Sequence, residues 1–121
     1  MTRDVVALLP RAPEVPDVMA AMAAAGEQLR VRSFGPGSVI QLCDEEGAAL
    51  VSIEVPVLVQ VPGEVERLLG PDAAAAVTPP LWWVEVRAPS VRPGAELLAR
   101  RFAETLAERC GGVVWPPEAP A

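Results

Sequence analysis

Short apolar segments, either continuous or alternating with polar residues, predict the β-strands of this chain. The predicted strand at residues 4–9 consists of Asp4 followed by an unbroken apolar run, which is typical of a central strand covered on both faces. Residues 38–43 and 51–61 flank the polar turn 44–47, so we expect them to pair as a β-hairpin. Pro56 has no N–H to donate within the second strand, which predicts a bend, a bulge or an edge position there. Further strands are expected at 29–32, 81–87 and 112–115.

Helical spacing of apolar residues predicts two main helices and one short helix. The segment Glu14-Val15-Pro16-Asp17 opens the first main helix, with proline near the first helical position, and Gly26 closes it. Its expected buried stripe consists of Val15, Val18, Met19 and Met22. The second begins at Pro93-Gly94, ends at Gly111 and buries Leu98, Ala99, Phe102, Ala103, Leu106 and Cys110. Residues 63–70 form the short helix, 34–37 a turn, and 71–80 a mobile loop.

This order of elements predicts an α+β fold. We expect a two-layer α/β sandwich of ferredoxin-like type, with a mainly antiparallel sheet. Right-handed crossovers would place both main helices on one face of the sheet and leave the other face open. The predicted single α+β domain covers residues 1–115, and residues 116–121 form a flexible proline-rich tail.

Composition excludes several classes of function. The 121 residues include 16 acidic and 10 basic side chains, a formal charge of −6 that repels nucleic acid. The chain has no histidine and no lysine, so it lacks the most common general base, metal imidazole and phosphate-loop amine. No apolar run approaches the roughly 20 residues of a membrane span. We therefore expect a cytoplasmic protein that binds neither nucleic acid nor membrane.

The few reactive residues do not form a motif for catalysis or for metal binding. Cys43 and Cys110 have no CxxC spacing, so buried, reduced thiols are expected at both positions. As a nucleophile, Cys43 would need activation by an arginine or a helix end. The acidic turn at 44–46 lacks the alternating ligand spacing of a calcium loop, and the glycines at 35 and 37 precede no lysine and no helix. We predict no catalytic residue, no metal site and no cofactor.

The segment LWWVEVR at 81–87 carries the most informative pattern. Successive strand residues face opposite sides, so Trp82, Val84 and Val86 are expected in the core and Trp83 on the open face. In the long strand, Val51, Ile53, Val55, Val57, Val59 and Val61 should share one face. The opposite, open face should carry Arg30, Arg32, Gln41, Cys43, Ser52, Glu54, Glu85 and Arg87. The predicted partner-binding residues are Trp83, Glu85, Arg87, Glu54 and Arg32.

Other interpretations of this face remain open. Trp83 could simply shield the sheet or lie beneath the 71–80 loop, with Glu85 and Arg87 as a cross-strand pair. A small-molecule pocket is a further alternative. A protein interface is favoured by the enrichment of Trp and Arg among the residues that dominate interface energy.

The segments VPGEVERLLG, PLWWVEVRA and RRFAETLAERCGGVVWP resemble those of a type of small protein of unknown role that is common in high-GC actinobacteria. The resemblance covers residues from about 50 to 115. It implies a bacterial cytosolic protein and supplies no catalytic motif.

Three functional hypotheses follow from the sequence. The first is a non-enzymatic interaction or dimerisation domain, a homodimer or a subunit, that uses the open sheet face. The second is an acidic inhibitor of a basic partner, like an immunity protein or an antitoxin, for which the net charge is the support. The least favoured is an enzyme that relies on carboxylates or Cys43.

Overall fold

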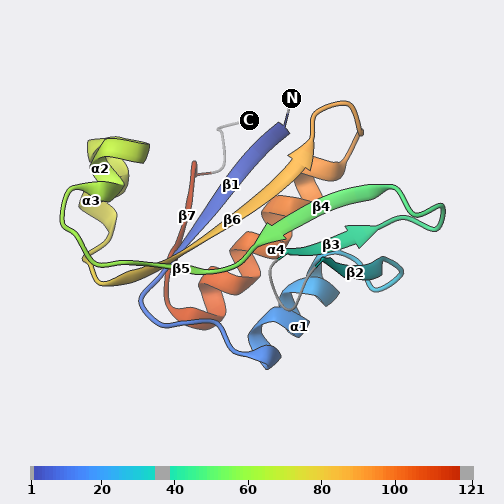
Figure 1. Cartoon of the computed structure of the whole chain (residues 1–121), viewed down its shortest axis with the longest axis horizontal. Helices are drawn as coiled ribbons and strands as arrows, with labels where there is room; N and C mark the ends of the chain where they lie inside the picture. The colour runs from blue at the N-terminus through green and yellow to red at the C-terminus, as the bar shows by residue number, and fades with distance from the viewer. Residues whose placement is uncertain (1, 35–38, 118–121) are drawn as a thin grey trace.

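The structure is a computed structural model that describes residues 2–34 and 39–117 (Figure 1). In chain order, its elements are β1 (Thr2–Leu9), α1 (Val15–Ala25), β2 (Arg30–Phe34), β3 (Val39–Cys43), β4 (Ala49–Glu54), β5 (Val57–Val59), α2 (Glu64–Leu69), α3 (Pro71–Ala76), β6 (Leu81–Pro89), α4 (Ala95–Cys110) and β7 (Val113–Trp115). Positions 35–37 of the predicted turn and 118–121 of the predicted tail lie outside the described residues.

The strands form one open sheet in which every pairing is antiparallel. The order is β2-β3-β4-β6-β1-β7, and β5 pairs with β6 beside β4. The predicted α+β class and antiparallel sheet are therefore confirmed. The strand order differs from the four-stranded ferredoxin-like plan that the sequence predicts, because β2 and β3 extend one edge beyond β4.

Two layers of helix cover the sheet unequally. The long helices α1 and α4 pack on one face, as predicted, over the first core cluster, which includes Val5, Val84 and Phe102. The short helices α2 and α3 contribute Val65 and Ala73 to a second cluster on the opposite face. The prediction that helices cover only one face is therefore wrong at this end of the sheet. Figure 1 shows α2 and α3 together at one end of the molecule, away from α1.

The buried side of α1 differs from the predicted stripe. Val15 and Met19 are 71% and 59% exposed, whereas Asp17, Ala21 and Ala25 are buried. The buried residues have i, i+4 spacing, so they lie on one side of the helix. Alanines on this side allow α1 to approach α4 closely, and Asp17 turns inward because two arginines bind it. Val18 and Met22 of the predicted stripe do pack against the first cluster, so the prediction is wrong for Val15 and Met19 only.

The predicted long strand 51–61 is two strands separated by a break at 55–56. The predicted interruption at Pro56 is confirmed, but the prediction of one shared face is wrong. Ile53 lies opposite Val86 and belongs to the first cluster, on the α1 and α4 side. After the break, Val57 lies opposite Trp83, and Val59 packs in the second cluster. The break therefore reverses the facing of the chain, since residues opposite each other in a sheet share a face.

The predicted mobile loop 71–80 contains a helix. Pro71 occupies the first helical position of α3, where its missing N–H costs nothing, and the alanine run that follows has high helix propensity. Ala73 is fully buried, so α3 is held by packing as well. Within the described residues, no helix has the length and apolar character needed to cross a membrane.

Candidate functional site

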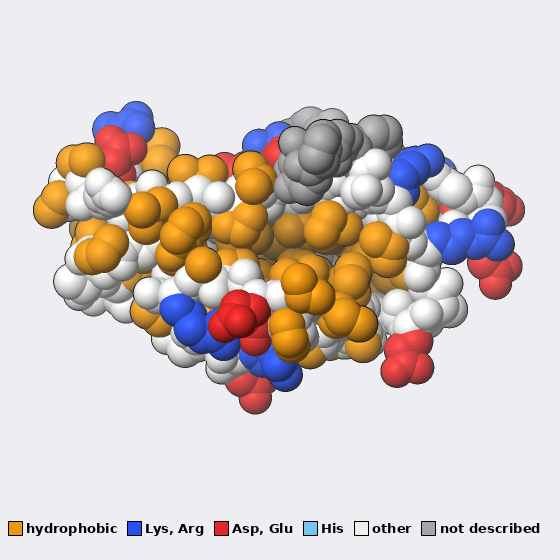
Figure 2. Space-filling view, turned by 60° about the horizontal axis from the view of Figure 1, so that its bottom comes forward, with side chains coloured by type: hydrophobic (Ala, Val, Ile, Leu, Met, Phe, Trp, Pro, Cys, Tyr) orange, Lys and Arg blue, Asp and Glu red, His pale blue; other side chains and the backbone are white. Residues whose placement is uncertain are grey.

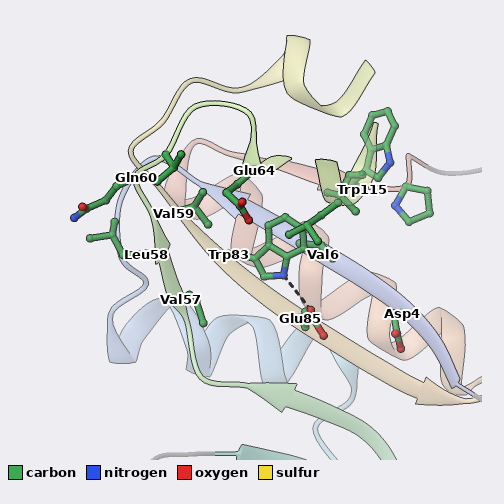
Figure 3. Close-up of a pocket in the computed structure, with 14 residues that line it drawn as sticks. Asp4, Val6, Val57, Leu58, Val59, Gln60, Glu64, Trp83, Glu85 and Trp115 are labelled. Carbon is green, nitrogen blue, oxygen red and sulfur yellow. Dashed lines mark hydrogen bonds between the residues drawn. The ribbon is translucent and has the colours of Figure 1, made fainter. Parts of the chain in front are cut away.

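A hollow lies on the sheet face opposite α1 and α4, beside β5 (Figure 3). It has a volume of about 600 Å³. We call it the β5 hollow. Residues of β1, β5, β6, α2 and β7 line it: Asp4, Val6, Val57, Leu58, Val59, Gln60, Val61, Glu64, Leu68, Leu69, Trp83, Glu85, Trp115 and Pro116. The site therefore combines two indoles, a group of aliphatic side chains and three carboxylates.

Trp83 forms the floor of the β5 hollow. Its side chain faces away from α1 and α4, as the alternation of strand residues predicts, while Trp82 packs against the first cluster. The expectation that Trp83 presents an amphipathic surface is wrong, because the residue is only 8% exposed. It packs with Val65 of α2 and Ala73 of α3, which agrees with the alternative that it lies beneath residues 71–80. Its indole Nε1 donates a hydrogen bond to Glu85 Oε1 at 3.2 Å (Figure 3).

Exposed aliphatic side chains form the walls and the rim. Val57 is 53% exposed and Leu68 is 50% exposed, and Leu58 and Val61 are exposed as well. Figure 3 shows Val57 and Val59 on the Trp83 side of β5, and Leu58 and Gln60 pointing away from it. Figure 2, which brings the bottom of the Figure 1 view forward, shows that hydrophobic side chains also form a band across the middle of that face, with charged side chains near its edges. Exposed apolar side chains on a domain surface normally occur singly, so their gathering here makes the β5 hollow the candidate site of this chain.

The three carboxylates of the β5 hollow come from different elements. Glu64 accepts two hydrogen bonds from Arg67, at 3.1 and 2.8 Å, and these bonds lower the pKa of Glu64. Glu85 accepts bonds of 3.2 and 2.6 Å from Arg87, which raise the pKa of that arginine. Neither arginine belongs to the lining, so the described lining residues carry acidic groups and no basic group. Both glutamates are therefore held in place by ion pairs with arginines outside the lining.

A row of polar residues crosses the same face next to the β5 hollow. Cross-strand register joins Arg32, Gln41, Ser52, Arg87 and Asp4, on five neighbouring strands. We call this set the polar row. Gln41 accepts a hydrogen bond from Arg32 at 3.0 Å and donates one to Ser52 at 3.2 Å. A second hollow of about 500 Å³ lies along the row, lined by Val39, Gln41, Ala49, Ser52, Glu54, Arg87, Ala88 and Pro89.

The structure brings four of the five predicted partner-binding residues into one cluster. Arg87 bonds Glu85 and lies 3.9 Å from a Glu54 carboxylate oxygen, and Glu85 in turn holds Trp83. Arg32 lies three strands away from Arg87 and is connected to it only along the polar row.

The residues that build the apolar wall are not predicted as a site from the sequence. A single alternation carried through Pro56 places Val57 on the helix-covered face, whereas the structure places it beside Trp83. Leu68 and Trp115 were placed correctly in a short helix and a final strand, but no local pattern connects these elements to β5. The available signal was the absence of charge in the segment 55–63, VPVLVQVPG.

A second polar cluster lies on the opposite side of the sheet, in the helix layer where α1 meets α4. Arg11 donates to Asp17 at 2.8 and 3.2 Å, and Arg109 donates at 3.0 Å. The Glu14 backbone N–H adds a bond of 2.8 Å to the same carboxylate. With its oxygens bound by protein donors, Asp17 clamps the start of α1 to the end of α4, and its role is structural.

The two cysteines and the acidic turn, the candidate reactive and metal-binding groups of the sequence, are buried or hydrogen-bonded within the fold. Cys43 and Cys110 are free, buried thiols, as predicted, and burial raises the pKa of Cys110. Asp44 accepts hydrogen bonds from the backbone N–H groups of Glu46 and Ala48, which closes the β3–β4 turn. Within residues 2–34 and 39–117, no group of three or more Cys, Asp and Glu residues is arranged to hold a metal ion.

Comparison of this chain with protein-family models, curated proteins and solved structures finds no match.

Proposed function

We propose that this chain is a non-enzymatic protein-interaction domain that binds through the β5 hollow and the adjacent polar row. The observation that carries this proposal is the group of half-exposed aliphatic side chains around the floor formed by Trp83. Protein interfaces combine an apolar centre with a polar rim, and Trp and Arg contribute strongly to their energy. Here the aliphatic side chains would form the apolar centre of the interface, and Arg87 with its glutamate partners would form its polar edge.

A protein partner is favoured over a small molecule for this surface. The volume of about 600 Å³ falls within the range of small-molecule sites. Such sites, however, enclose most of the ligand and direct a few polar groups into the cavity. In the β5 hollow the apolar groups stand on an exposed rim, and Arg67 and Arg87 already hold Glu64 and Glu85. An extended complementary surface satisfies this arrangement better than a small ligand does.

The test of this proposal compares two leucines of nearly equal exposure, one on the short helix α2 and one on the long helix α4. Leu68 lines the β5 hollow, and Leu97 on α4 does not; their exposures are 50% and 51%. Immobilised wild type, Leu68→Asp and Leu97→Asp are incubated with lysate from the natural host, and retained proteins are purified. Each is then titrated calorimetrically against all three chains. We expect a partner whose affinity falls at least about tenfold with Leu68→Asp and stays unchanged with Leu97→Asp. Equal affinities for the three chains would contradict the proposal.

A second candidate is an acidic inhibitor of a basic partner. Its specific support is the lining of the β5 hollow, which contains Asp4, Glu64 and Glu85 in a chain of charge −6. Opposite charges accelerate association and are screened by salt. In this case the association rate with the captured partner falls steeply between low and high ionic strength. A rate that is insensitive to salt argues for the general interaction domain.

We also propose a finer classification of the fold, as a ferredoxin-like unit with two added strands. The unit consists of β4, β6, β1 and β7, in that order, with α1 and α4 following β1 and β6. Its support is that β1 and β4 both run antiparallel to β6, which lies between them. In this description β2 and β3 form an extension at one edge.

A further inference from the structure

The outer edge of β5 has no strand neighbour within the described part of the chain. β5 pairs with β6 on one side, and β3 pairs with β4 only as far as Val39 opposite Glu54. A free strand edge presents backbone N–H and C=O groups that can pair with another strand. We propose that this edge pairs with β5 of a second copy, so that the two sheets join across a twofold axis. This inference rests on the proposed function and specifies one partner for the same surface.

β5 differs from the other edge strands of the sheet because it carries no charged side chain and exposes apolar ones. The segment 55–63 contains no charged residue, and Val55, Val57, Leu58 and Val61 are exposed in it. The edge strand β2, in contrast, carries Arg30 and Arg32, and charged side chains protect an edge from pairing. The edge strand β7 is also uncharged, but its three side chains are partly buried. Of the edges that the structure describes, β5 is the one that combines exposed apolar side chains with no charge.

The absence of charge favours a second copy as the occupant. Each chain carries −6, so two copies repel each other through most of their surfaces. An uncharged edge permits self-pairing without bringing like charges into contact. Self-pairing about a twofold axis also uses the same segment of both chains, which closes the assembly at two copies.

The flanking prolines limit the length of the pairing segment. Pro56 and Pro62 have no N–H, so a ladder with the second copy is restricted to residues 57–61. So short a ladder is weak by itself. The exposed side chains of Leu58 and Val61 must therefore contribute apolar contact across the axis, and Leu68 on the rim of the β5 hollow lies near them. A dimer of moderate affinity follows.

The test measures association state by sedimentation velocity and equilibrium from about 1 to about 100 µM. We expect the wild type to shift from monomer to dimer in this range. Leu58→Arg places a charge on the pairing edge and should remain monomeric, whereas the control Leu97→Arg, on α4, should associate like the wild type. Salt should strengthen the dimer, because it screens the repulsion between two acidic chains. In hydrogen exchange, the amides of residues 57–61 should gain protection at high concentration.

Gln60→Glu is the second variant, in case Leu58→Arg does not fold. Gln60 is exposed, so the substitution preserves the monomer and brings two carboxylates near the axis, which weakens the dimer. A wild type that stays monomeric at the highest concentration overturns the inference. Equal association of the β5 variants and Leu97→Arg overturns it too. In either case, loss of a captured partner with Leu68→Asp still supports the proposed function, so the two failures are distinguishable.

Discussion

Asp17 connects three parts of the chain that are distant in sequence. Its carboxylate binds Arg11, which precedes α1, and Arg109, which lies in the last turn of α4. Arg11 Nη2 also donates to the carbonyl oxygen of Arg109 at 2.9 Å. Since Asp17 is the buried charged residue among those described, its neutralisation would leave two arginines without their shared partner.

We predict that Asp17 makes stability sensitive to acid. The hydrogen bond from Arg11 is the main reason that the pKa of Asp17 lies well below its ordinary value. A lowered folded-state pKa means that the stabilisation is complete above the unfolded value of about 3.9 and is lost as the pH falls below it. Asp17→Asn should lower the thermal midpoint at pH 7 by roughly 5–10 °C. Below about pH 4, the midpoint of this variant should fall less steeply with decreasing pH than that of the wild type. Thermal unfolding from pH 2 to pH 7 measures both effects.

Glu27→Gln is the control for this prediction. Glu27 is exposed in the turn after α1, and its substitution removes one negative charge, as Asp17→Asn does. It should leave the midpoint and its pH dependence close to those of the wild type. If Asp17→Asn and Glu27→Gln give the same profile, the clamp does not stabilise the fold.

At the scale of elements, α3 determines the environment of Trp83. Ala73 has no exposed surface and packs in the second cluster with Trp83 and Val65. Through this residue α3 joins the cluster on the sheet face that carries Trp83. The cluster makes Trp83 a buried floor instead of an exposed platform.

We predict that Ala73→Leu destabilises the domain by about 2 kcal/mol, because a close-packed cluster has no room for three additional carbons. Ala75→Leu is the matched control on the same helix, at an exposed position, and should change stability by less than about 0.5 kcal/mol. Urea unfolding followed by tryptophan fluorescence measures both variants. A neutral Ala73→Leu would show that α3 does not pack firmly against the sheet.

Local patterns predict most elements of this fold but not their surroundings. The alternation in LWWVEVR assigns Trp82 and Trp83 to their correct faces. It cannot show that α3 covers Trp83, because that contact depends on packing between segments distant in structure. The predicted α1 stripe is wrong at Val15 and Met19 and correct at Val18 and Met22. The buried alanines of α1 are missed because alanines at a helix contact carry little hydrophobic signal. Glu85 and Arg87 do pair, but within β6 and not across two strands as predicted from the sequence. The wall at Val57 and Leu68 requires the three-dimensional fold.

At the scale of the whole molecule, the sheet separates two cores of unequal size. Residues 5, 7 and 9 of β1 belong to the first cluster, and residues 6 and 8 belong to the second. β1 is therefore covered on both faces, as its unbroken apolar sequence predicts, and it lies between β6 and β7. The β2 edge, by contrast, has exposed side chains at 30–33.

We predict that this asymmetry appears in hydrogen exchange of the monomer. Amides of β1 and β6 should exchange only through global unfolding, while those of β2 should exchange through local opening at least about 100-fold faster. Exchange measured by mass spectrometry at concentrations of about 1 µM tests the prediction without association. Uniform protection of β1 and β2 would show that the sheet opens as a single unit.

The break at Pro56 separates two segments in which substitutions are expected to have different effects. Before it, Val51 and Ile53 fill the space beneath the long helices, so substitution there threatens folding itself. Beyond it, the reversed facing places Val57 at the surface, where a new side chain can alter binding at little structural cost. If the proposed interaction surface is correct, exchanging this one short stretch should retune recognition and leave the scaffold intact.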